Sequence, residues 1–281
     1  MKHIQDKIEE FLAEVKDAVA TEKLLLPSLP EVALKIKTEC EKEGSSSQKI
    51  ADVICQDPAM SVRLLQIANS SLYRTRHSAD NIQSAITKLG LNLVRDLIMG
   101  LSMKQLYRAS NDIIAERFHE LWMASTKTAS IARLLAMKID HLDAEQAMLA
   151  GLTHNIGALP IILMAEDDDD LFDNAEALYK VVNKMQGEVG AYIFRNWHFP
   201  EYMAEVASDC YSFRRNHTGP ADYVDVVQVA LIEGSIYTGL EVPEDWSTIA
   251  AFARLGIDPL TSMLDTEENM LIFEETDSLF K

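Results

Sequence analysis

The sequence predicts an all-α, multi-helical protein. Apolar residues recur at helical spacing over most of the chain, prolines and glycines separate these stretches, and no stretch alternates clearly enough to be a strand. The chain has 281 residues, of which 48% are hydrophobic. This length and composition can bury a substantial core, in one large domain or in two closely packed lobes.

The first twenty residues predict an amphipathic helix. Apolar side chains recur at helical spacing there, with acids and lysines between them: Ile4, Ile8, Phe11, Leu12, Val15 and Val19. Because the polar face mixes charges of both signs, we expect the helix to pack on the body of the protein. A membrane-surface helix would carry a basic face, and a signal peptide would not interleave charges with its apolar residues.

Three helix starts are expected in the next part of the chain. Two prolines, Pro27 and Pro30, hold the chain extended before the first of them. The starts lie where a capping signal precedes an apolar run, which is near Glu31, at Ser46 or Ser47, and at Asp57-Pro58. The third helix should end near Asn69.

Two short helices are expected on either side of Gly90. Asp80 or a neighbour should cap the first, Gly90 suits its left-handed stop, and Asn92 can cap the second. Such a pair resembles a helix-turn-helix, in which the second helix would have to read DNA. The exposed positions of that helix include Asp96 and only one arginine, Arg95, so a structural helical hairpin is favoured.

The second half of the chain predicts further helices, at about 115–137, 171–197, 201–212, 220–238 and 245–255. Asp143 with Gln146 makes a near capping box for another helix, which runs toward His154. The acidic run 166–170 lacks the interleaved spacing and glycine of a calcium loop, so we interpret it as a solvated loop with helix N-terminal charge. The C-terminal piece, LDTEENMLIFEETDSLFK, is either a docked helix or a loosely held tail.

Charge and cysteine content argue against several classes of protein. A net charge of -18 repels phosphate backbones, so we expect no nucleic-acid partner. No run of eighteen or more apolar residues is present, so we expect no membrane span. Three widely spaced cysteines fit reduced thiols in a cytoplasm. Two short basic clusters are interpreted as solvated surface: Arg74, Arg76 and His77, and Arg214, Arg215 and His217.

One tract carries the question of chemistry. A predicted helix delivers His154 and Asn155 at its end, and Gly157 lets the chain turn closely past them. In the HD metal phosphohydrolases this position reads His-Asp, because an imidazole and a carboxylate together hold a divalent ion that activates water. A full site needs at least one further histidine upstream and one aspartate downstream.

Six ordered blocks resemble the HDOD family, which is related to the HD and HD-GYP phosphodiesterases and usually lacks intact catalytic residues. The resemblance covers about residues 25–240, through the blocks 26–36, 50–73, 82–103, 121–136, 150–161 and 187–201. It implies an HD-like fold in which an N-terminal helical lobe (1–112, with the HDOD core beginning near residue 25) packs on an HD-like lobe (113–258). An acidic C-terminal tail (259–281) follows.

The departures from the catalytic HD pattern remove most of the expected metal ligands. Ala124 stands where the first metal histidine is expected, Asn155 replaces the aspartate next to His154, and Leu231 stands at the distal aspartate. Asp225, the nearest acid, would complete the site only in a different alignment. One histidine and one asparagine are a poor site for a hard cation, so we predict no bound metal, no cofactor and no catalytic residue.

The remaining motif residues have mainly structural interpretations. We expect His154 to be a hydrogen-bonded core histidine rather than a working ligand, and Asn155 to bond backbone groups. Both are named as the vestigial HD site. Four further positions are candidates for a cleft or for family motifs, and the first three of them more often cap helices than bind ligands: Gln56, Asp57, Asn69 and Arg95.

Together these observations predict a non-catalytic signal-transduction or scaffold module in a bacterial cytoplasm. It would act through a signalling protein partner, and a small-molecule effector could occupy the vestigial cleft. The resemblance implies bacterial signalling, often alongside sensor kinases or cyclic-dinucleotide enzymes. Two alternatives stay open: a metal-dependent phosphohydrolase acting on a nucleotide or cyclic dinucleotide, and a transcription regulator that uses the short helical hairpin.

Overall fold

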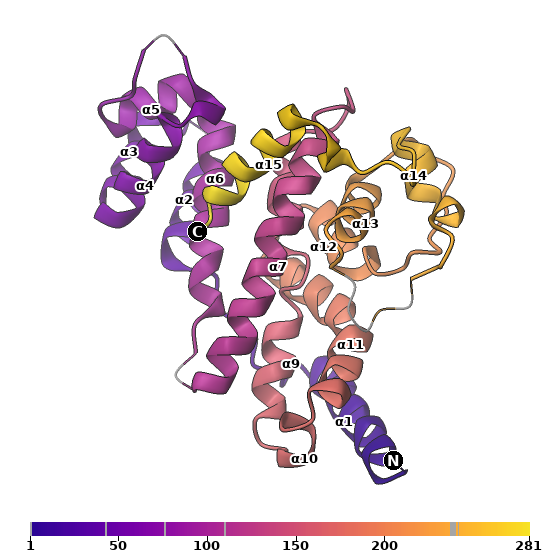
Figure 1. The fold of residues 1–281 in the computed structure, drawn as a ribbon. Helices are drawn as coiled ribbons and strands as arrows, with labels where there is room; N and C mark the ends of the chain where they lie inside the picture. The colour runs from indigo at the N-terminus through magenta and orange to yellow at the C-terminus, as the bar shows by residue number, and fades with distance from the viewer. Residues whose placement is uncertain (1, 43, 76, 110, 237–239, 241) are drawn as a thin grey trace.

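The computed structural model describes residues 2–42, 44–75, 77–109, 111–236, 240 and 242–281, and these residues form helices with no strand among them (Figure 1). Arg76 of the first basic cluster lies outside the described residues. The helices of the N-terminal lobe are α2 (Glu31–Glu41), α3 (Ser47–Cys55), α4 (Pro58–Ala68), α5 (Ile82–Leu89) and α6 (Leu91–Met103). In this lobe α2 packs on α6 and α3, and α5 packs on α3 and α4.

The helix starts of this lobe follow local capping chemistry. Ser46 accepts a hydrogen bond from the backbone of Lys49 at the start of α3. Asp57 caps α4 through a 3.0 Å bond from the Met60 amide, with Pro58 in the first turn. Asn81, the neighbour of Asp80, caps α5 in a capping box. Each of these residues satisfies a backbone amide that a helix start leaves unpaired.

Two details at the α5–α6 turn differ from expectation. Gly90 has a positive φ of 86°, but its ψ of 156° is extended rather than left-handed helical. α6 begins at Leu91, and its first backbone bond runs from Val94 to the Gly90 carbonyl. Asn92 therefore lies inside the helix, and its prediction as a cap was wrong because the one-residue glycine connection leaves no room for a separate cap.

The HD-like lobe is built around the long helix α7 (Asp112–Ala136), which packs against α8 (Ala144–Thr153) and α13 (Tyr223–Glu233). The lobe also contains α9 (Ala158–Ala165), α10 (Asp169–Phe172), α11 (Ala175–Asn196), α12 (Glu201–Asp209) and α14 (Ala250–Leu255). A Cβ added at Gly151 would lie 2.9 Å from the Ala129 Cα, and one at Gly157 would lie 2.0 Å from the Gln186 carbonyl oxygen. Glycine at these positions therefore permits the closest approaches of α8 to α7 and of the α9 entry to α11.

The segment Ala144–Ala165 has the length and the mean hydropathy, 1.6, of a membrane-spanning helix. However, 89% of its 18-residue window is buried inside the fold, and the segment is divided between α8 and α9. It is therefore accounted for by the protein core, which has the same apolar composition.

α1 (Lys2–Ala20) packs against α10 and α11 of the HD-like lobe, at the opposite end of the molecule from α3–α5 (Figure 1). The Lys7 ammonium lies 3.4 Å from the Asp168 carboxylate, which also accepts a bond from the Leu171 amide. The acidic run thus supplies a helix-start charge, as expected. Residues 1–20, which were grouped with the N-terminal lobe, thus bury their apolar face on α10 and α11 of the other lobe.

The C-terminal segment is a docked helix rather than a loose tail. α15 (Glu267–Ser278) packs on α7. The end of α15 and the backbone after it are held from both lobes. Arg63 on α4 donates to the Ser278 carbonyl at 2.8 Å, and Trp122 on α7 donates to the Phe280 carbonyl at 3.3 Å. Phe280 itself is buried, so this segment joins the two lobes.

Candidate functional site

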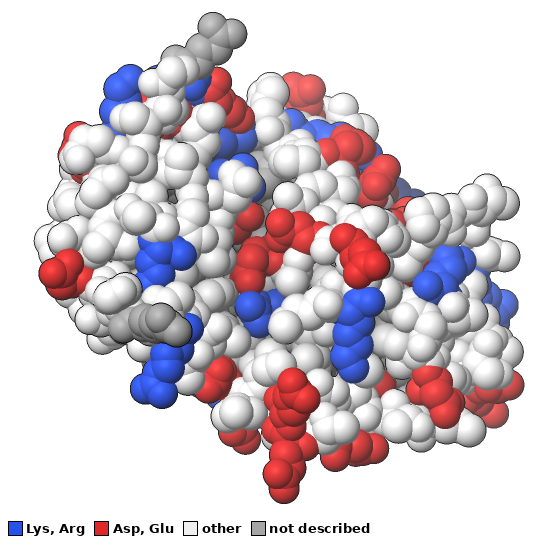
Figure 2. Space-filling view, turned by 90° about the horizontal axis from the view of Figure 1, so that it is seen from above, with Lys and Arg blue, Asp and Glu red and all other residues white. Residues whose placement is uncertain are grey.

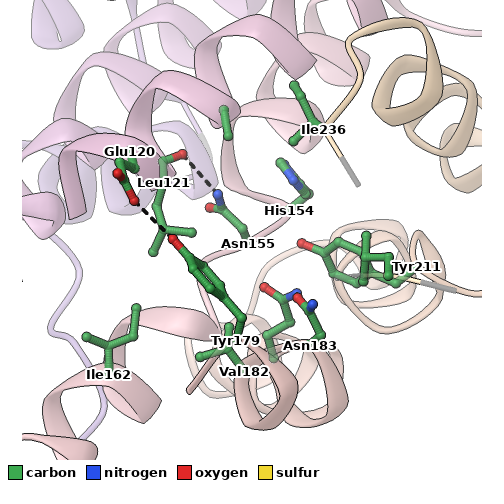
Figure 3. Close-up of a pocket in the computed structure, with 13 residues that line it drawn as sticks. Glu120, Leu121, His154, Asn155, Ile162, Tyr179, Val182, Asn183, Tyr211 and Ile236 are labelled. Atoms are coloured by element: carbon green, nitrogen blue, oxygen red, sulfur yellow. Dashed lines mark hydrogen bonds between the residues drawn. The ribbon is translucent and has the colours of Figure 1, made fainter. Parts of the chain in front are cut away.

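A cavity of about 300 Å³ opens in the HD-like lobe beside His154 and Asn155 (Figure 3). Its walls come mainly from α7, the α8–α9 turn and α11. The described residues that line it are Glu120, Leu121, Ala124, His154, Asn155, Ile162, Tyr179, Val182, Asn183, Gln186, Tyr211, Ile236 and Leu240. The two residues of the vestigial HD site therefore do lie at a cavity.

His154 closes the C-terminal end of α8 and is buried. Its Nδ1 lies 2.7 Å from the Gly151 carbonyl oxygen. Because a carbonyl can only accept, Nδ1 carries the proton and Nε2 carries the lone pair. Burial lowers the pKa of His154 to about 4, against a smaller opposing effect of the Gly151 hydrogen bond. The imidazole is therefore neutral at physiological pH, in the tautomer whose Nε2 is an acceptor.

Asn155 connects three parts of the fold through three hydrogen bonds. Its Oδ1 accepts from the Tyr107 hydroxyl at 2.7 Å and from the Ser125 hydroxyl at 2.9 Å. Its Nδ2 donates to the Leu121 carbonyl at 3.0 Å (Figure 3). Burial raises the pKa of Tyr107, which keeps its hydroxyl protonated and able to donate. Both lone pairs of Oδ1 are thus occupied within the protein.

Of the other expected ligand positions, only one lines this cavity. Ala124 lines it and presents a methyl group where the upstream histidine was expected. Leu231 is fully buried in α13 and is not among the lining residues. Asp225 is also absent from the lining and lies in the first turn of α13. The substitution at Ala124 therefore acts directly on the cavity.

The residues at this cavity do not fit a divalent metal ion. One imidazole nitrogen is available, and the neighbouring amide oxygen is already used twice by hydroxyl donors. The one carboxylate in the described lining, Glu120, accepts a 3.0 Å bond from the Tyr179 hydroxyl on α11. Metal sites of hard or borderline cations need three or four convergent ligands, and this set does not supply them.

Within the described residues, the only group of three potential ligands lies elsewhere, at His217, Asp222 and Asp225. Arg254 binds Asp225 bidentately, with bonds of 2.5 and 2.8 Å, and Arg215 lies 2.6 Å from Asp222. Burial tends to raise the pKa of Asp225, but the bond from Arg254 and further hydrogen bonds lower it overall. Guanidinium groups already neutralise these carboxylates, so this is an ion-pair network that fixes the start of α13.

Besides Glu120, four polar residues of the cavity were not predicted. Tyr179, Asn183 and Gln186 lie on α11, and Tyr211 follows α12. The Gln186 amide donates to Asn183 at 3.1 Å, and the Tyr211 ring lies 5.9 Å from the His154 ring. Figure 3 shows the Tyr211 hydroxyl pointing toward the interior of the site. The spacing of 179, 183 and 186 places polar groups on one face of α11 next to its apolar stripe, and this signal was available in the sequence.

None of the four candidate motif positions lines this cavity. Gln56 follows α3 and accepts from Lys35 at 3.1 Å, while Asp57 caps α4. Asn69 holds the backbone of Ala79 through two bonds of 2.7 Å. Arg95 faces a different groove, between the lobes. Of the first three residues, only Asp57 caps a helix with its side chain, whereas the side chains of Gln56 and Asn69 bond Lys35 and the Ala79 backbone.

The fold is all-α and HD-like, and its cavity is lined by His154 and Asn155. The HDOD domain model matches residues 26–212, and the chain belongs to the HDOD domain family. A curated but uncharacterized protein from Treponema pallidum is 24% identical over 70% of this chain, and the match spans 39% of that protein's length. The chain therefore spans well under half the length of that relative.

Solved structures agree on the fold. A candidate metal-dependent phosphohydrolase from Shewanella amazonensis is 27% identical, with a TM-score of 0.85, covering 98% of this chain and 100% of its own. A candidate signal transduction protein from Marinobacter aquaeolei is 19% identical, with a TM-score of 0.58, covering 98% of this chain and 64% of its own. The latter similarity concerns the fold alone.

Proposed function

We propose that this protein is a non-catalytic, cytoplasmic signal-transduction module that acts through a protein partner, with the cavity beside His154 available to a small uncharged effector. The observation that carries the proposal is the use of Asn155 as an internal cross-link, since both lone pairs of its Oδ1 accept from hydroxyls and its Nδ2 is bound to Leu121. An oxygen engaged in this way offers nothing to a metal ion.

The charge of the cavity supports the same proposal. Among the described lining residues, Glu120 is the only acid, no lysine or arginine is present, and His154 is held neutral by burial. Phosphate esters are bound through guanidinium, ammonium or metal cations. The cavity suits an uncharged molecule that hydrogen-bonds to imidazole, amide and phenol groups.

The surface supports a partner other than nucleic acid. On the face shown in Figure 2, acidic and basic side chains are interspersed without a continuous basic stripe. Arg215 and His217 of one basic cluster bond Asp222 and Asp225. Phosphate backbones require unpaired basic groups on one face, so these paired side chains favour a protein partner.

The alternative function is a metal-dependent phosphohydrolase acting on a nucleotide or cyclic dinucleotide. Two observations favour it: the similarity to the Shewanella amazonensis protein, and the His154 tautomer, whose Nε2 acceptor is the form that a metal ligand requires. The donor set around His154 opposes it.

Metal content and hydrolysis distinguish the two functions. We expect the dialysed full chain to hold no stoichiometric transition metal. With added Mn²⁺ or Mg²⁺, hydrolysis of cyclic di-GMP and of bis(p-nitrophenyl) phosphate should be equal for the parent and for His154→Ala. About one or two metals per chain, the occupancy of an intact catalytic site, together with turnover that a folded His154→Ala variant loses, would establish the phosphohydrolase instead.

A further inference from the structure

A groove of about 420 Å³ lies between the two lobes, and it shares no lining residue with the cavity beside His154. α2 and α6 form one side, while α8, the loop before α12 and α12 itself form the other. Its volume falls within the range of small-molecule sites, roughly 300–1,000 Å³. A molecule bound there would contact both lobes at once.

The chemistry of the groove centres on Arg95 and Asp96, which are adjacent on α6. The Arg95 side chain folds back so that its Nε and Nη2 donate to the two carboxylate oxygens of Asp96, at 2.8 and 3.2 Å. Asp96 is nearly buried, while a third of the Arg95 side chain is exposed. A buried carboxylate therefore fixes the plane of the guanidinium of a partly exposed arginine that lines the groove, an arrangement that orients an arginine toward a ligand.

The Asp96 bonds leave the other edge of the guanidinium available. A guanidinium has five N–H groups and can bind a carboxylate on its Nε–Nη2 edge or on its Nη1–Nη2 edge. Asp96 occupies the first edge, and no described residue accepts a hydrogen bond from Nη1. The Nη1–Nη2 edge of Arg95 is thus a preformed fork for a second planar anion.

Two neighbours complete a site for an anion with an apolar body. The half-buried Tyr202 ring packs 4.7 Å from the Tyr223 ring, and no described residue bonds its hydroxyl, which burial keeps protonated by raising the Tyr202 pKa. Met99, Leu149 and Phe199 supply apolar wall. A charged fork, a phenol donor and an apolar wall are the usual elements of a small-molecule site.

The loop that carries Phe199 into the groove contains a strained residue. His198 has a φ of 54°, in the left-handed region that residues other than glycine rarely adopt. Its Nδ1 lies 2.9 Å from the Asn196 carbonyl, and the Phe199 ring packs against the rings of both Phe194 and Trp197. Such strain persists where surrounding contacts fix it, often at binding sites.

The charge balance selects the kind of anion. Arg95 is paired with Asp96, and Lys37, the other fully charged cation of the groove, lies 2.5 Å from Glu41. The groove has no surplus positive charge, and the whole chain carries -18. Electrostatic repulsion from such a field costs a monoanion less binding free energy than it costs a dianion. The field therefore favours a carboxylate over a phosphate monoester.

We propose that this groove is a second ligand site, which binds the carboxylate of a small, partly apolar acid on the Nη1–Nη2 edge of Arg95. The acid's apolar part packs against Met99, Leu149 and Phe199, so the bound molecule fixes the position of α6 relative to α8 and α12. This site is independent of the function proposed for the His154 cavity.

The test compares small acids with their own neutral amides on the intact chain. Benzoate, phenylacetate and hexanoate are titrated against benzamide, phenylacetamide and hexanamide, and binding is followed by ¹H–¹⁵N spectra. We expect at least one acid to bind about ten-fold more tightly than its amide, the ratio expected for a charge-assisted fork. Its shifts should lie in α6, the loop 197–200 and α12.

Three variants locate the site. Arg95→Lys keeps a cation beside Asp96 but loses the fork, and it should weaken acid binding about ten-fold. Tyr202→Phe removes only the hydroxyl and should weaken it about five-fold. Arg195→Lys, at an exposed ion pair with Glu201 outside the groove, is the matched control and should bind as the parent does.

Three results overturn the proposal. The first is that no acid of the panel binds more tightly than its amide. The second is that Arg95→Lys and Tyr202→Phe, with parental melting temperatures, bind the acid as the parent does. The third is that phenyl phosphate binds the groove more tightly than benzoate, which would reject the monoanion. If Arg95→Lys fails to fold, the Tyr202→Phe titration alone decides.

Discussion

The side-chain amide of Asn155 donates a 3.0 Å hydrogen bond to the backbone carbonyl oxygen of Leu121. An ionised aspartate at this position has no proton to give and would place a negative oxygen against the carbonyl. The residue that separates this chain from the His-Asp pattern is therefore the residue that its own fold requires. The amide at position 155 therefore supplies a structural cross-link that an ionised aspartate could not supply.

Asn155→Asp should consequently destabilise the protein at neutral pH, by about 3 kcal/mol, because it buries a charge beside an unsatisfied carbonyl. Burial of the charge raises the pKa of this aspartate in the folded variant, so the deficit relative to the parent should shrink as the pH falls below that raised pKa. It should be smallest at about pH 4 and below, where the protonated acid can donate to Leu121. Urea denaturation of both proteins at pH 7 and pH 4 measures this. Ser125→Ala, which removes one of two donors to Oδ1, should cost only about 1 kcal/mol.

The buried His154 predicts a stability that depends on pH. Its pKa is about 4 in the folded protein and 6.5 when unperturbed, so the unfolded chain binds the proton first as the pH falls. Stability should therefore be lost between about pH 6.5 and pH 4, by a total of about 3 kcal/mol from this group. His154→Gln cannot be protonated and should lose less stability between pH 7 and pH 5 than the parent. Equal losses in the two proteins would contradict the buried, neutral assignment.

Local signals predicted where helices begin, but not what meets at the cavity. The starts at Glu31 and at Asp57-Pro58 depend on residues within one turn, so the sequence contains the whole cause. The cross-link at Asn155 depends on Tyr107 and Leu121, which are 48 and 34 residues away. No periodicity in the sequence encodes such a pairing. The family resemblance pointed to His154 and Asn155 but not to the residues that bond Asn155.

Asp57 offers a direct measurement of one local signal. Its Oδ1 accepts from the Met60 amide at 3.0 Å, and no other residue of the described chain replaces that bond. Asp57→Ala should cost about 0.5–2 kcal/mol, whereas Asp57→Asn, which keeps a capping oxygen, should cost much less. If Asp57→Ala leaves both the denaturation midpoint and the slope unchanged, the Asp57 cap does not stabilise α4.

Because the C-terminal segment is docked on the fold, truncating Phe280 should destabilise the protein as much as truncating a core residue. This side chain is 2% exposed, and its ring meets the Trp122 ring edge-on at 6.4 Å. Phe280→Ala should destabilise the protein by about 3–5 kcal/mol, as in other buried phenylalanines. Leu271→Ala, on the same segment but 55% exposed, is the control and should change stability by less than about 0.5 kcal/mol. Similar melting temperatures for the two variants would mean that the segment is not part of the core.

The non-catalytic proposal makes a prediction in the cell. An enzyme that activates water on a metal loses orders of magnitude in rate when a ligand is removed, because the ion contributes several kcal/mol to the transition state. If this chain works by docking a partner, removing the imidazole of His154 should leave its biological role largely intact. Complementation of a deletion strain by His154→Ala measures this, with circular dichroism to establish that the variant folds.

Surface substitutions that disrupt partner docking should abolish complementation without affecting the fold. A pull-down from the native cytoplasm, followed by mass spectrometry, identifies the partner whose binding these variants should lose. The result against the proposal has two parts that must occur together. A folded His154→Ala variant would fail to complement, and it would also lose a nucleotide or cyclic-dinucleotide hydrolysis that the parent shows. Hydrolysis requires a metal, so the metal ligands would then have to come from residues other than Asn155, whose oxygen is committed to Tyr107 and Ser125.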